Sequence, residues 1–145
     1  MYKRQISLRG RLEEIKSGNL KMIAGNNRLI VDGGHNISAS LSIAHWIKNQ
    51  NQEVNLIVGM MKDKEHIEFI KSFRNIVNSI TLIDIPNQDG AISKENLESK
   101  LKELNLNIKK SHSIESAIKS LSKNVNTITV CIGSLYLAGE ILKLN

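Results

Sequence analysis

Cysteine, proline and aromatic residues are all scarce in this chain of 145 residues. The single cysteine, Cys131, excludes an intramolecular disulfide. Its place inside the apolar run from Ile128 to Ile132 predicts a buried, unreactive thiol rather than a nucleophile. Aromatic residues make up only 3% of the chain, so isoleucine and leucine must fill the core. The same shortage leaves few rings to stack on bases, and nucleic acid is therefore not an expected partner.

Long apolar runs are also missing. No stretch approaches the roughly 20 residues that span a bilayer, and residues 1–5 lead into no apolar signal-peptide core. We therefore expect a cytoplasmic protein without a membrane partner. The formal net charge of +6 leaves two interpretations open, a solvated basic surface or a surface that attracts an acidic ligand such as a nucleotide phosphate or glutamate.

From residue 29 onwards, short apolar runs alternate with amphipathic stretches. The runs are rich in branched residues, as is typical of strands buried on both faces. They cover 29–31, 56–58, 80–85 and 128–132, with a weaker edge candidate at 106–110. Apolar residues recur at helical spacing between the runs and after the last one, and Ser93 and Ser113 are placed to cap two helices. The alternation predicts an α/β fold with a mostly parallel, doubly wound, Rossmann-like sheet and helices on both faces.

The first 28 residues differ from the rest. They are basic and contain Gly10, Gly18 and Gly25. This composition predicts a short N-terminal β-ribbon or interdomain linker over residues 1–28, followed by the α/β domain over residues 29–145.

Small and polar residues follow three of the apolar runs, where ligands bind in such a sheet. The turns are Asp32–Asn36 with Gly33, Gly34 and His35, then Gly59–Glu65 with Lys62 and Asp63, then Gly133–Tyr136 with Ser134. Asp32 can accept hydrogen bonds from ribose hydroxyls, and paired glycines allow positive φ and a close ligand. Lys62 offers a cation to a carboxylate or phosphate. Each residue also has a purely structural alternative as a cap, a turn or a solvated charge, but their convergence on one rim favours a binding site.

These turns resemble the successive signatures of the C-terminal domain of folylpolyglutamate synthases and dihydrofolate synthases, in the Mur ligase superfamily. The matching segments are Gly10–Glu13, which contains Arg11, then Asp32–Asn36, Gly59–Glu65 and Gly133–Leu137. The family's patterns are approximately G-R-x-E, D-G-A-H-N-P, G-x-x-x-D-K-D and G-S-x-Y, and order and spacing fit over nearly the whole chain. Gly34 replaces the family's alanine, Ile37 its proline and Glu65 its aspartate.

The resemblance implies a ligase that uses ATP and Mg²⁺ to activate a carboxylate of folate or dihydropteroate as an acyl phosphate, which the amine of L-glutamate attacks. It assigns Arg11 and Asp32 to ATP, and His35, Lys62 and Ser134 to glutamate. The supporting loop residues are Gly33, Gly34, Asn36, Gly59, Asp63, Gly133 and Tyr136. The family's N-terminal domain carries the phosphate loop and most of the metal site, so this chain alone is expected to hold no metal and no catalytic residue.

The phosphate loop itself is absent from the sequence. None of the nine glycines is followed by lysine, as the pattern G-x-x-x-x-G-K-[ST] requires. We therefore expect a chain that is inactive alone and needs a P-loop ATPase domain as its partner. Three origins stay open: a domain of a longer protein, a separately encoded half, or a product of gene decay, with Met1 favouring the last two. A non-catalytic remnant and a generic nucleotide-binding module are the alternative functions.

Overall fold

The computed structural model describes residues 10–145, and the first nine residues of the predicted N-terminal ribbon lie outside the described residues. The fold is built on one six-stranded sheet with the order β1-β2-β6-β3-β4-β5. The strands are β1 (Glu13–Glu14), β2 (Arg28–Val31), β3 (Val54–Val58), β4 (Ser79–Leu82), β5 (Ile108–Lys110) and β6 (Ile128–Ile132). Strand β1 pairs antiparallel with β2, and every other pair is parallel. The predicted mostly parallel sheet is confirmed.

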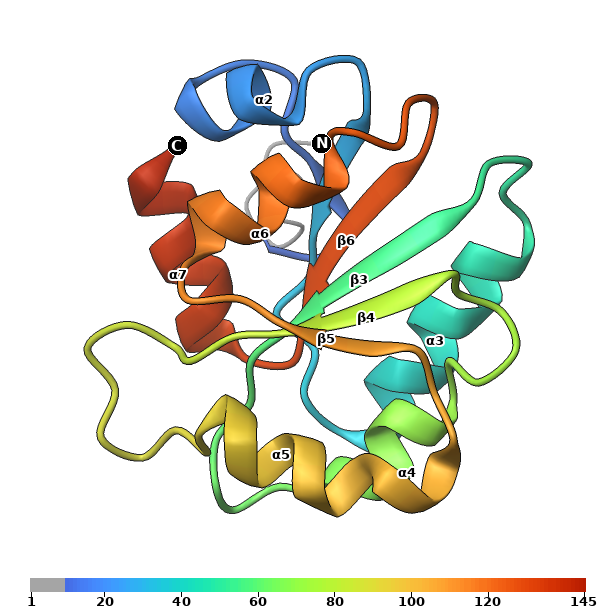
Figure 1. The fold of residues 1–145 in the computed structure, drawn as a ribbon, viewed down its shortest axis with the longest axis vertical. Helices are drawn as coiled ribbons and strands as arrows, with labels where there is room; N and C mark the ends of the chain where they lie inside the picture. The colour runs from blue at the N-terminus through green and yellow to red at the C-terminus, as the bar shows by residue number, and fades with distance from the viewer. Residues whose placement is uncertain (1–9) are drawn as a thin grey trace, which may run out of the picture.

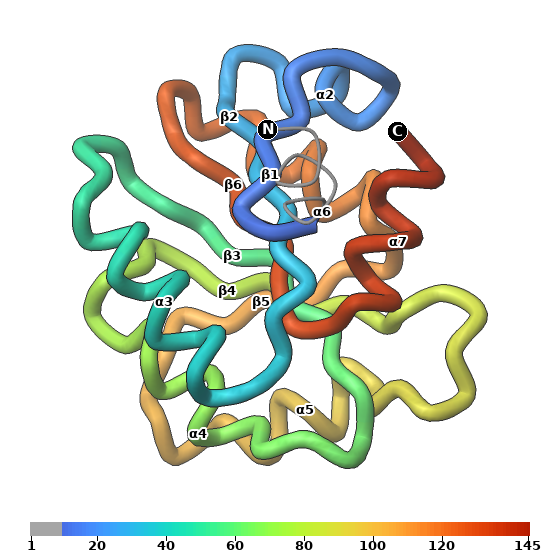
Figure 2. The backbone as a smooth tube through the Cα atoms, turned by 180° about the vertical axis from the view of Figure 1, so that it is seen from behind, coloured from blue at the N-terminus to red at the C-terminus, as the bar shows by residue number. Residues whose placement is uncertain are grey.

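Helices cover both faces of this sheet (Figure 1). They are α2 (Asn19–Ala24), α3 (Ile37–Lys48), α4 (His66–Lys71), α5 (Lys94–Leu101), α6 (Ile114–Leu121) and α7 (Leu135–Leu144), with a 3-10 turn η1 (Lys102–Leu104) after α5. Helices α3, α4 and α5 lie on one side, and α2, α6 and α7 on the other, as the view from behind also shows (Figure 2). Each side has its own hydrophobic core, the first core under α3, α4 and α5 and the second core under α2, α6 and α7. Successive strand residues alternate between them: Leu56 and Val58 lie in the first core, and Ile57 lies in the second. No helix in residues 10–145 is long and apolar enough to cross a membrane.

Local signals account for most helix starts. The Ser93 hydroxyl accepts a hydrogen bond from the Asn96 amide at 3.1 Å, and the Ser113 hydroxyl accepts one from the Ser116 amide at 3.0 Å. Both predicted N-caps are confirmed. Cys131 is fully buried, as predicted, and burial raises the pKa of its thiol to about 12.

One strand is shorter than predicted. The apolar run 80–85 pairs as a strand only as far as Leu82, although Ile83 and Ile85 remain buried in the second core. Asp84 between them accepts hydrogen bonds from the backbone amide and the ammonium of Lys94, at 2.9 and 2.8 Å. This side-chain contact fixes the turn into α5, which the apolar pattern did not indicate.

The segment before β2 holds a helix as well as a short strand. Strand β1 spans two residues and is followed by α2, whose Leu20 and Ala24 are buried in the second core. The Asn145 side chain accepts a hydrogen bond from the Leu20 amide at 2.9 Å, so a residue 125 positions away caps this helix. The prediction of a ribbon or linker thus missed α2. The division of the chain after residue 28 stays a prediction.

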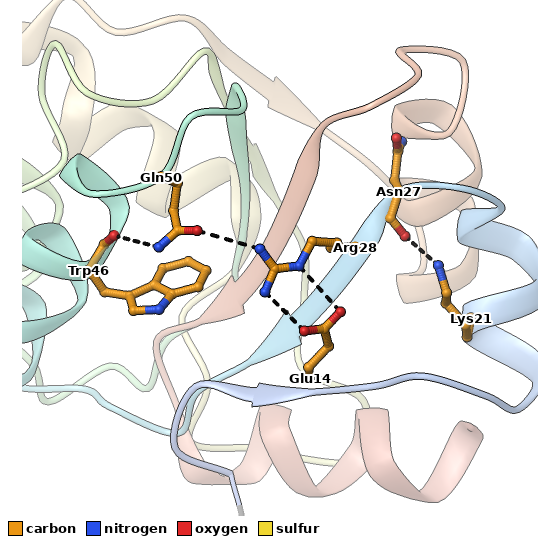
Figure 3. Close-up of polar contacts among 6 residues, drawn as sticks. All are labelled: Glu14, Lys21, Asn27, Arg28, Trp46 and Gln50. Atoms are coloured by element: carbon orange, nitrogen blue, oxygen red, sulfur yellow. Dashed lines mark hydrogen bonds and ion pairs between the residues drawn. The ribbon is translucent and has the colours of Figure 1, made fainter.

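Arg28, at the start of β2, contacts residues of β1 and α3 (Figure 3). Its guanidinium donates to both carboxylate oxygens of Glu14, at 2.9 and 3.3 Å, and lies 5.9 Å from the centre of the Trp46 ring. The hydrogen bond from Arg28 lowers the pKa of the Glu14 carboxyl. Because this contact sits at the amino end of β2, it stabilises the fold at the edge opposite the predicted site.

Candidate functional site

The strand order places the three predicted turns side by side. Strands β2, β6 and β3 are neighbours and run parallel, so their carboxyl ends meet at one edge of the sheet. The Gly133 amide donates to the Gly34 carbonyl at 3.1 Å, and the Gly59 amide donates to the Ile132 carbonyl at 3.3 Å. Asp32 and Ser134 therefore lie on the same edge, as the sequence predicts.

Glycine is required where two of these turns touch. Gly133 has a φ of +115°, and a Cβ there would collide with the carbonyl oxygen of Gly59. The sequence suggested instead that Gly33 and Gly34 adopt positive φ, and this is wrong, because neither is among the positive-φ glycines. Glycine is favoured at Gly34 because of crowding, since a Cβ there would lie 2.7 Å from the Cβ of Ala39.

The Asp32 carboxylate ties the N-terminal segment to the first turn. One oxygen accepts from the Gly34 amide at 2.6 Å, and the other accepts from the Leu12 amide at 3.0 Å. The Gly33 amide also donates to the Gly10 carbonyl at 2.5 Å. These contacts hold Leu12 at a φ of +46° and place Arg11, between Gly10 and Leu12, at the carboxyl edge of the sheet. The family resemblance groups Arg11 with Asp32, and the structure brings both residues to the same edge.

Burial raises the pKa of the Asp32 carboxyl above its ordinary value of 3.8, and the two amide hydrogen bonds and the Arg11 charge oppose that rise. The folded state therefore holds the Asp32 proton more tightly than the unfolded state. The corresponding stability is present below pH 3.8 and is lost as the pH rises through the folded-state pKa.

Arg11→Gln is expected to raise the pKa of Asp32 further, because it removes the one charge that favours the carboxylate. The loss of stability with rising pH should then extend to higher pH than in the unmodified chain. Carboxyl NMR titration of Asp32 and urea unfolding between about pH 3 and 7 measure both effects. Arg74→Gln, which changes another exposed arginine, is the control. An equal shift in both variants would show that Arg11 acts only through net charge.

The largest hollow at this edge is a cleft of about 620 Å³. Its lining comes from two chain segments that meet at Asp32, together with the first turns of α3 and the start of α7. The residues are Gly10–Leu12, Asp32–Asn36, Ser38, Ala39, Ser42, Ile43 and Leu135. Arg11, Asp32 and His35 are thus brought together in one cleft, with the cation exposed and the carboxylate half-buried.

A second hollow of about 240 Å³ adjoins the first and shares His35 and Leu135 with it. Ser134, Tyr136 and Asp63 line it, as does Lys64, which the sequence analysis did not single out. Lys62 lines neither hollow; its side chain is exposed, and its amide donates to the Gly90 carbonyl at 2.8 Å. The signal for Lys64 was present in the sequence, because Asp63–Glu65 is the segment that matches the family's D-K-D pattern.

Two of the predicted site residues are also helix caps. Asn36 caps α3 by accepting from the Ala39 amide at 2.8 Å, and Ser134 caps α7 by accepting from the Tyr136 amide at 3.0 Å. The Ser134 oxygen already accepts from the Tyr136 amide, so its hydroxyl proton is what it can still offer to a ligand. Ser134 is only 2% exposed, but it lines the second hollow. The predicted structural and binding roles of Ser134 are therefore compatible.

Ile37→Pro is expected to stabilise the fold by about 0.4–1 kcal/mol. Ile37 is the first residue of α3, where proline is preferred, and the preceding Asn36 has φ −117° and ψ 173°, which a following proline tolerates. The melting temperature should rise slightly in calorimetry. Ile67→Pro, one residue inside α4, gives the comparison and should not stabilise. A destabilised Ile37→Pro protein would show that this apolar side chain matters more than the backbone.

Leu135 lines both hollows and Tyr136 lines the second, and both side chains are exposed, as is Leu41 on α3. Leu135 is 64% exposed, Leu41 60% and Tyr136 54%. Within residues 10–145 no group of three or more histidine, cysteine, aspartate and glutamate side chains could hold a metal ion. The edge therefore offers the cations of Arg11 and Lys64, the carboxylates of Asp32 and Asp63, hydroxyls and apolar surface, but no metal cluster among the described residues.

Residues 16–144 match the family model described as the dihydrofolate synthetase C-terminal domain. No curated protein sequence matches the chain. Among solved structures, the chain is similar to Mycobacterium tuberculosis folylpolyglutamate synthase complexed with ADP, with 17% identity and a TM-score of 0.78, covering 93% of this chain and 32% of that one.

Two further structures show the same likeness. Escherichia coli FolC in complex with DHPP and ADP has 18% identity and a TM-score of 0.75. The bifunctional folylpolyglutamate synthase/dihydrofolate synthase of Yersinia pestis, complexed with AMPPNP and Mn ion, has 17% identity and a TM-score of 0.74. Each match covers 94% of this chain and 31% of the other. At these identities the likeness concerns the fold, and the chain spans about a third of the length of these enzymes.

Proposed function

Because the chain belongs to the family of dihydrofolate synthetase C-terminal domains, we propose that it is the ATP-contacting and glutamate-presenting part of a cytoplasmic ligase that joins L-glutamate to folate or dihydropteroate. In this reaction ATP phosphorylates a substrate carboxylate. The glutamate nitrogen attacks the resulting acyl carbon, the C–N bond forms, phosphate leaves with the electron pair of the C–O bond, and the amine loses a proton. The chain alone completes none of these steps, since its sequence has no phosphate loop.

The observation that carries this proposal is the cleft at the carboxyl edge of the sheet. Arg11 lies beside the half-buried Asp32 carboxylate, so the cleft offers an exposed cation for phosphate oxygens and an acceptor for ribose hydroxyls. Both Asp32 oxygens already accept backbone amides, but a carboxylate has about four lone-pair sites and can accept more. We assign Arg11 and Asp32 to ATP on this basis.

Glutamate is assigned to the adjoining hollow. His35 stands between the two hollows, and its Nδ1 lies 3.3 Å from the Gly33 carbonyl oxygen. Ser134 offers a hydroxyl proton there, and a lysine of the 59–65 turn supplies the charge that a carboxylate requires. The family resemblance assigned Lys62, whereas the lining of the hollow favours Lys64. We keep both lysines as candidates that a single experiment separates.

The partner in this proposal is a P-loop ATPase domain that covers the exposed apolar side chains of Leu135 and Tyr136 beside the two hollows. Such a domain accounts for the two thirds of the related enzymes that this chain does not span. It would also hold Mg²⁺, because the residues described in this chain include no suitable ligand cluster. Mg²⁺ neutralises phosphate charge when bound, and this chain's own part is to contact the nucleotide and position the amine.

A chimera tests the proposal. Residues 10–145 replace the matching third of Escherichia coli FolC, and ADP release and ligated product are followed with dihydropteroate and L-glutamate. The chimera is expected to ligate, and the isolated chain is expected to release no ADP above a mock purification. A chimera that unfolds cooperatively and binds ADP, yet forms no product with either dihydropteroate or folate, would favour a non-catalytic remnant.

The same chimera separates the two lysines. Removing a charge-assisted hydrogen bond to a bound carboxylate costs about 1.5–3 kcal/mol, or roughly 10- to 150-fold in affinity. Lys64→Ala is therefore expected to raise the KM for glutamate by about that factor and to leave the KM for ATP nearly unchanged. Lys62→Ala is the matched comparison. A larger effect of Lys62→Ala would return the role to the residue that the resemblance assigned.

A further inference from the structure

A basic hollow of about 280 Å³ lies beside the edge strand β5 and helix α6, on the side of the sheet opposite β1. Its lining includes Thr81 and Lys109, which are register partners on β4 and β5. Ser116 and Ser120, one turn apart on α6, line one wall. The remaining lining residues are Lys94, Lys110, Ser111, His112 and Ala117. The lining thus combines three lysines, a histidine and four hydroxyls with no acidic side chain.

The lysines of this hollow are not equivalent. Lys94 pairs with Asp84 at 2.8 Å and with Glu95 at 3.4 Å. Lys110 pairs with Glu98 at 3.0 Å. Lys109 has no acidic partner within the described part of the chain. Its ammonium is therefore available to an anion that enters the hollow.

Hydroxyls beside Lys109 complete the donor set. The Ser111 hydroxyl donates to the Ser116 hydroxyl at 3.0 Å, which leaves the Ser116 proton free to point into the hollow. Thr81 and Ser120 add two further O–H donors. An ammonium and several hydroxyls around a small volume favour one compact anion with several oxygen acceptors.

We propose that this hollow binds a single oxyanion, a phosphate or carboxylate group, at a site separate from the cleft at Asp32. The proposal does not depend on the ligase function, because it concerns the isolated chain. The competing interpretation is that Lys109 only discourages pairing of another strand with the exposed edge strand β5. An edge-blocking lysine needs no hydroxyl neighbours and gives no saturable binding.

Amide NMR of the isolated chain separates the two interpretations. Inorganic phosphate or glutarate is added at constant ionic strength, maintained with sodium chloride. Saturable shifts are expected at residues 109–112 and 116–120, and the probe that saturates at the lower concentration identifies phosphate or carboxylate as the preferred group. Shifts that grow linearly with both probes, or that occur elsewhere only, would overturn the proposal.

Charge-matched variants complete the test. Lys109→Gln is expected to weaken binding about tenfold or more, as the loss of a charge-assisted contact does. Lys71→Gln removes an exposed lysine at the end of α4 and should change binding less than twofold. Ser120→Ala removes a hydroxyl from an exposed helix position and should weaken binding without loss of helix. Equal losses in both lysine variants would show that only net charge matters and would exclude the site.

Discussion

Replacing Gly133 with alanine is expected to lower the free energy of unfolding by about 3 kcal/mol or more. Two costs combine. A non-glycine residue held at a φ of +115° stores roughly 1–3 kcal/mol of backbone strain. The added Cβ also meets the Gly59 carbonyl oxygen, a backbone atom that cannot move aside, and such overpacking costs roughly another 1–3 kcal/mol.

Gly139→Ala is the matched control, with the opposite expected sign. Gly139 lies inside α7, the helix that begins two residues after Gly133, and no atom lies within 4 Å of a Cβ added there. Alanine in an exposed helix interior stabilises by about 0.5–1 kcal/mol relative to glycine. Urea unfolding of the two variants gives both values. A Gly133→Ala protein as stable as the unmodified chain would mean that the turns after β6 and β3 do not pack as described.

Asp32→Ala is expected to destabilise the fold by about 2–3 kcal/mol and to release Arg11 from the cleft. The substitution removes the acceptor for the Leu12 and Gly34 amides, and hydrogen bonds to a charged acceptor contribute roughly 1.5–3 kcal/mol each. Relief of the buried carboxylate, whose desolvation raises its pKa, offsets part of that loss. Amide hydrogen exchange should accelerate at Leu12 and Gly34 more than elsewhere.

Two further variants sharpen this prediction. Asp32→Asn keeps one acceptor oxygen and replaces the other with an NH2 donor, so it should lose about half as much stability as the alanine variant or more. Asp89→Ala removes an exposed aspartate from the loop before α5 and should stay within about 0.5 kcal/mol of the unmodified chain. Unchanged exchange at Leu12 in Asp32→Ala would show that the Gly10–Leu12 segment is held by other contacts.

Local patterns in the sequence were enough to predict the parallel strands, most helices and the edge of the sheet at which the candidate site lies. Continuous branched runs such as 128–132 can be buried on both faces only in a covered sheet, and serines such as Ser93 and Ser113 act within three residues of themselves. Parallel strands then place their following turns on one edge. For these reasons, Asp32 and Ser134 could be expected on the same rim before any coordinates.

Only the tertiary structure decided features that depend on contacts distant in sequence. Helix α2 has no local side-chain cap and takes one from Asn145, and a pattern read along the chain cannot show that contact. The spacing between Lys62 and Lys64 likewise does not say which ammonium enters the hollow, because the direction of a turn is set by what it packs against. The same holds for Gly133. Glycine is required there by the carbonyl of Gly59, which follows β3, a strand adjacent to β6 in the sheet but far from it in the sequence.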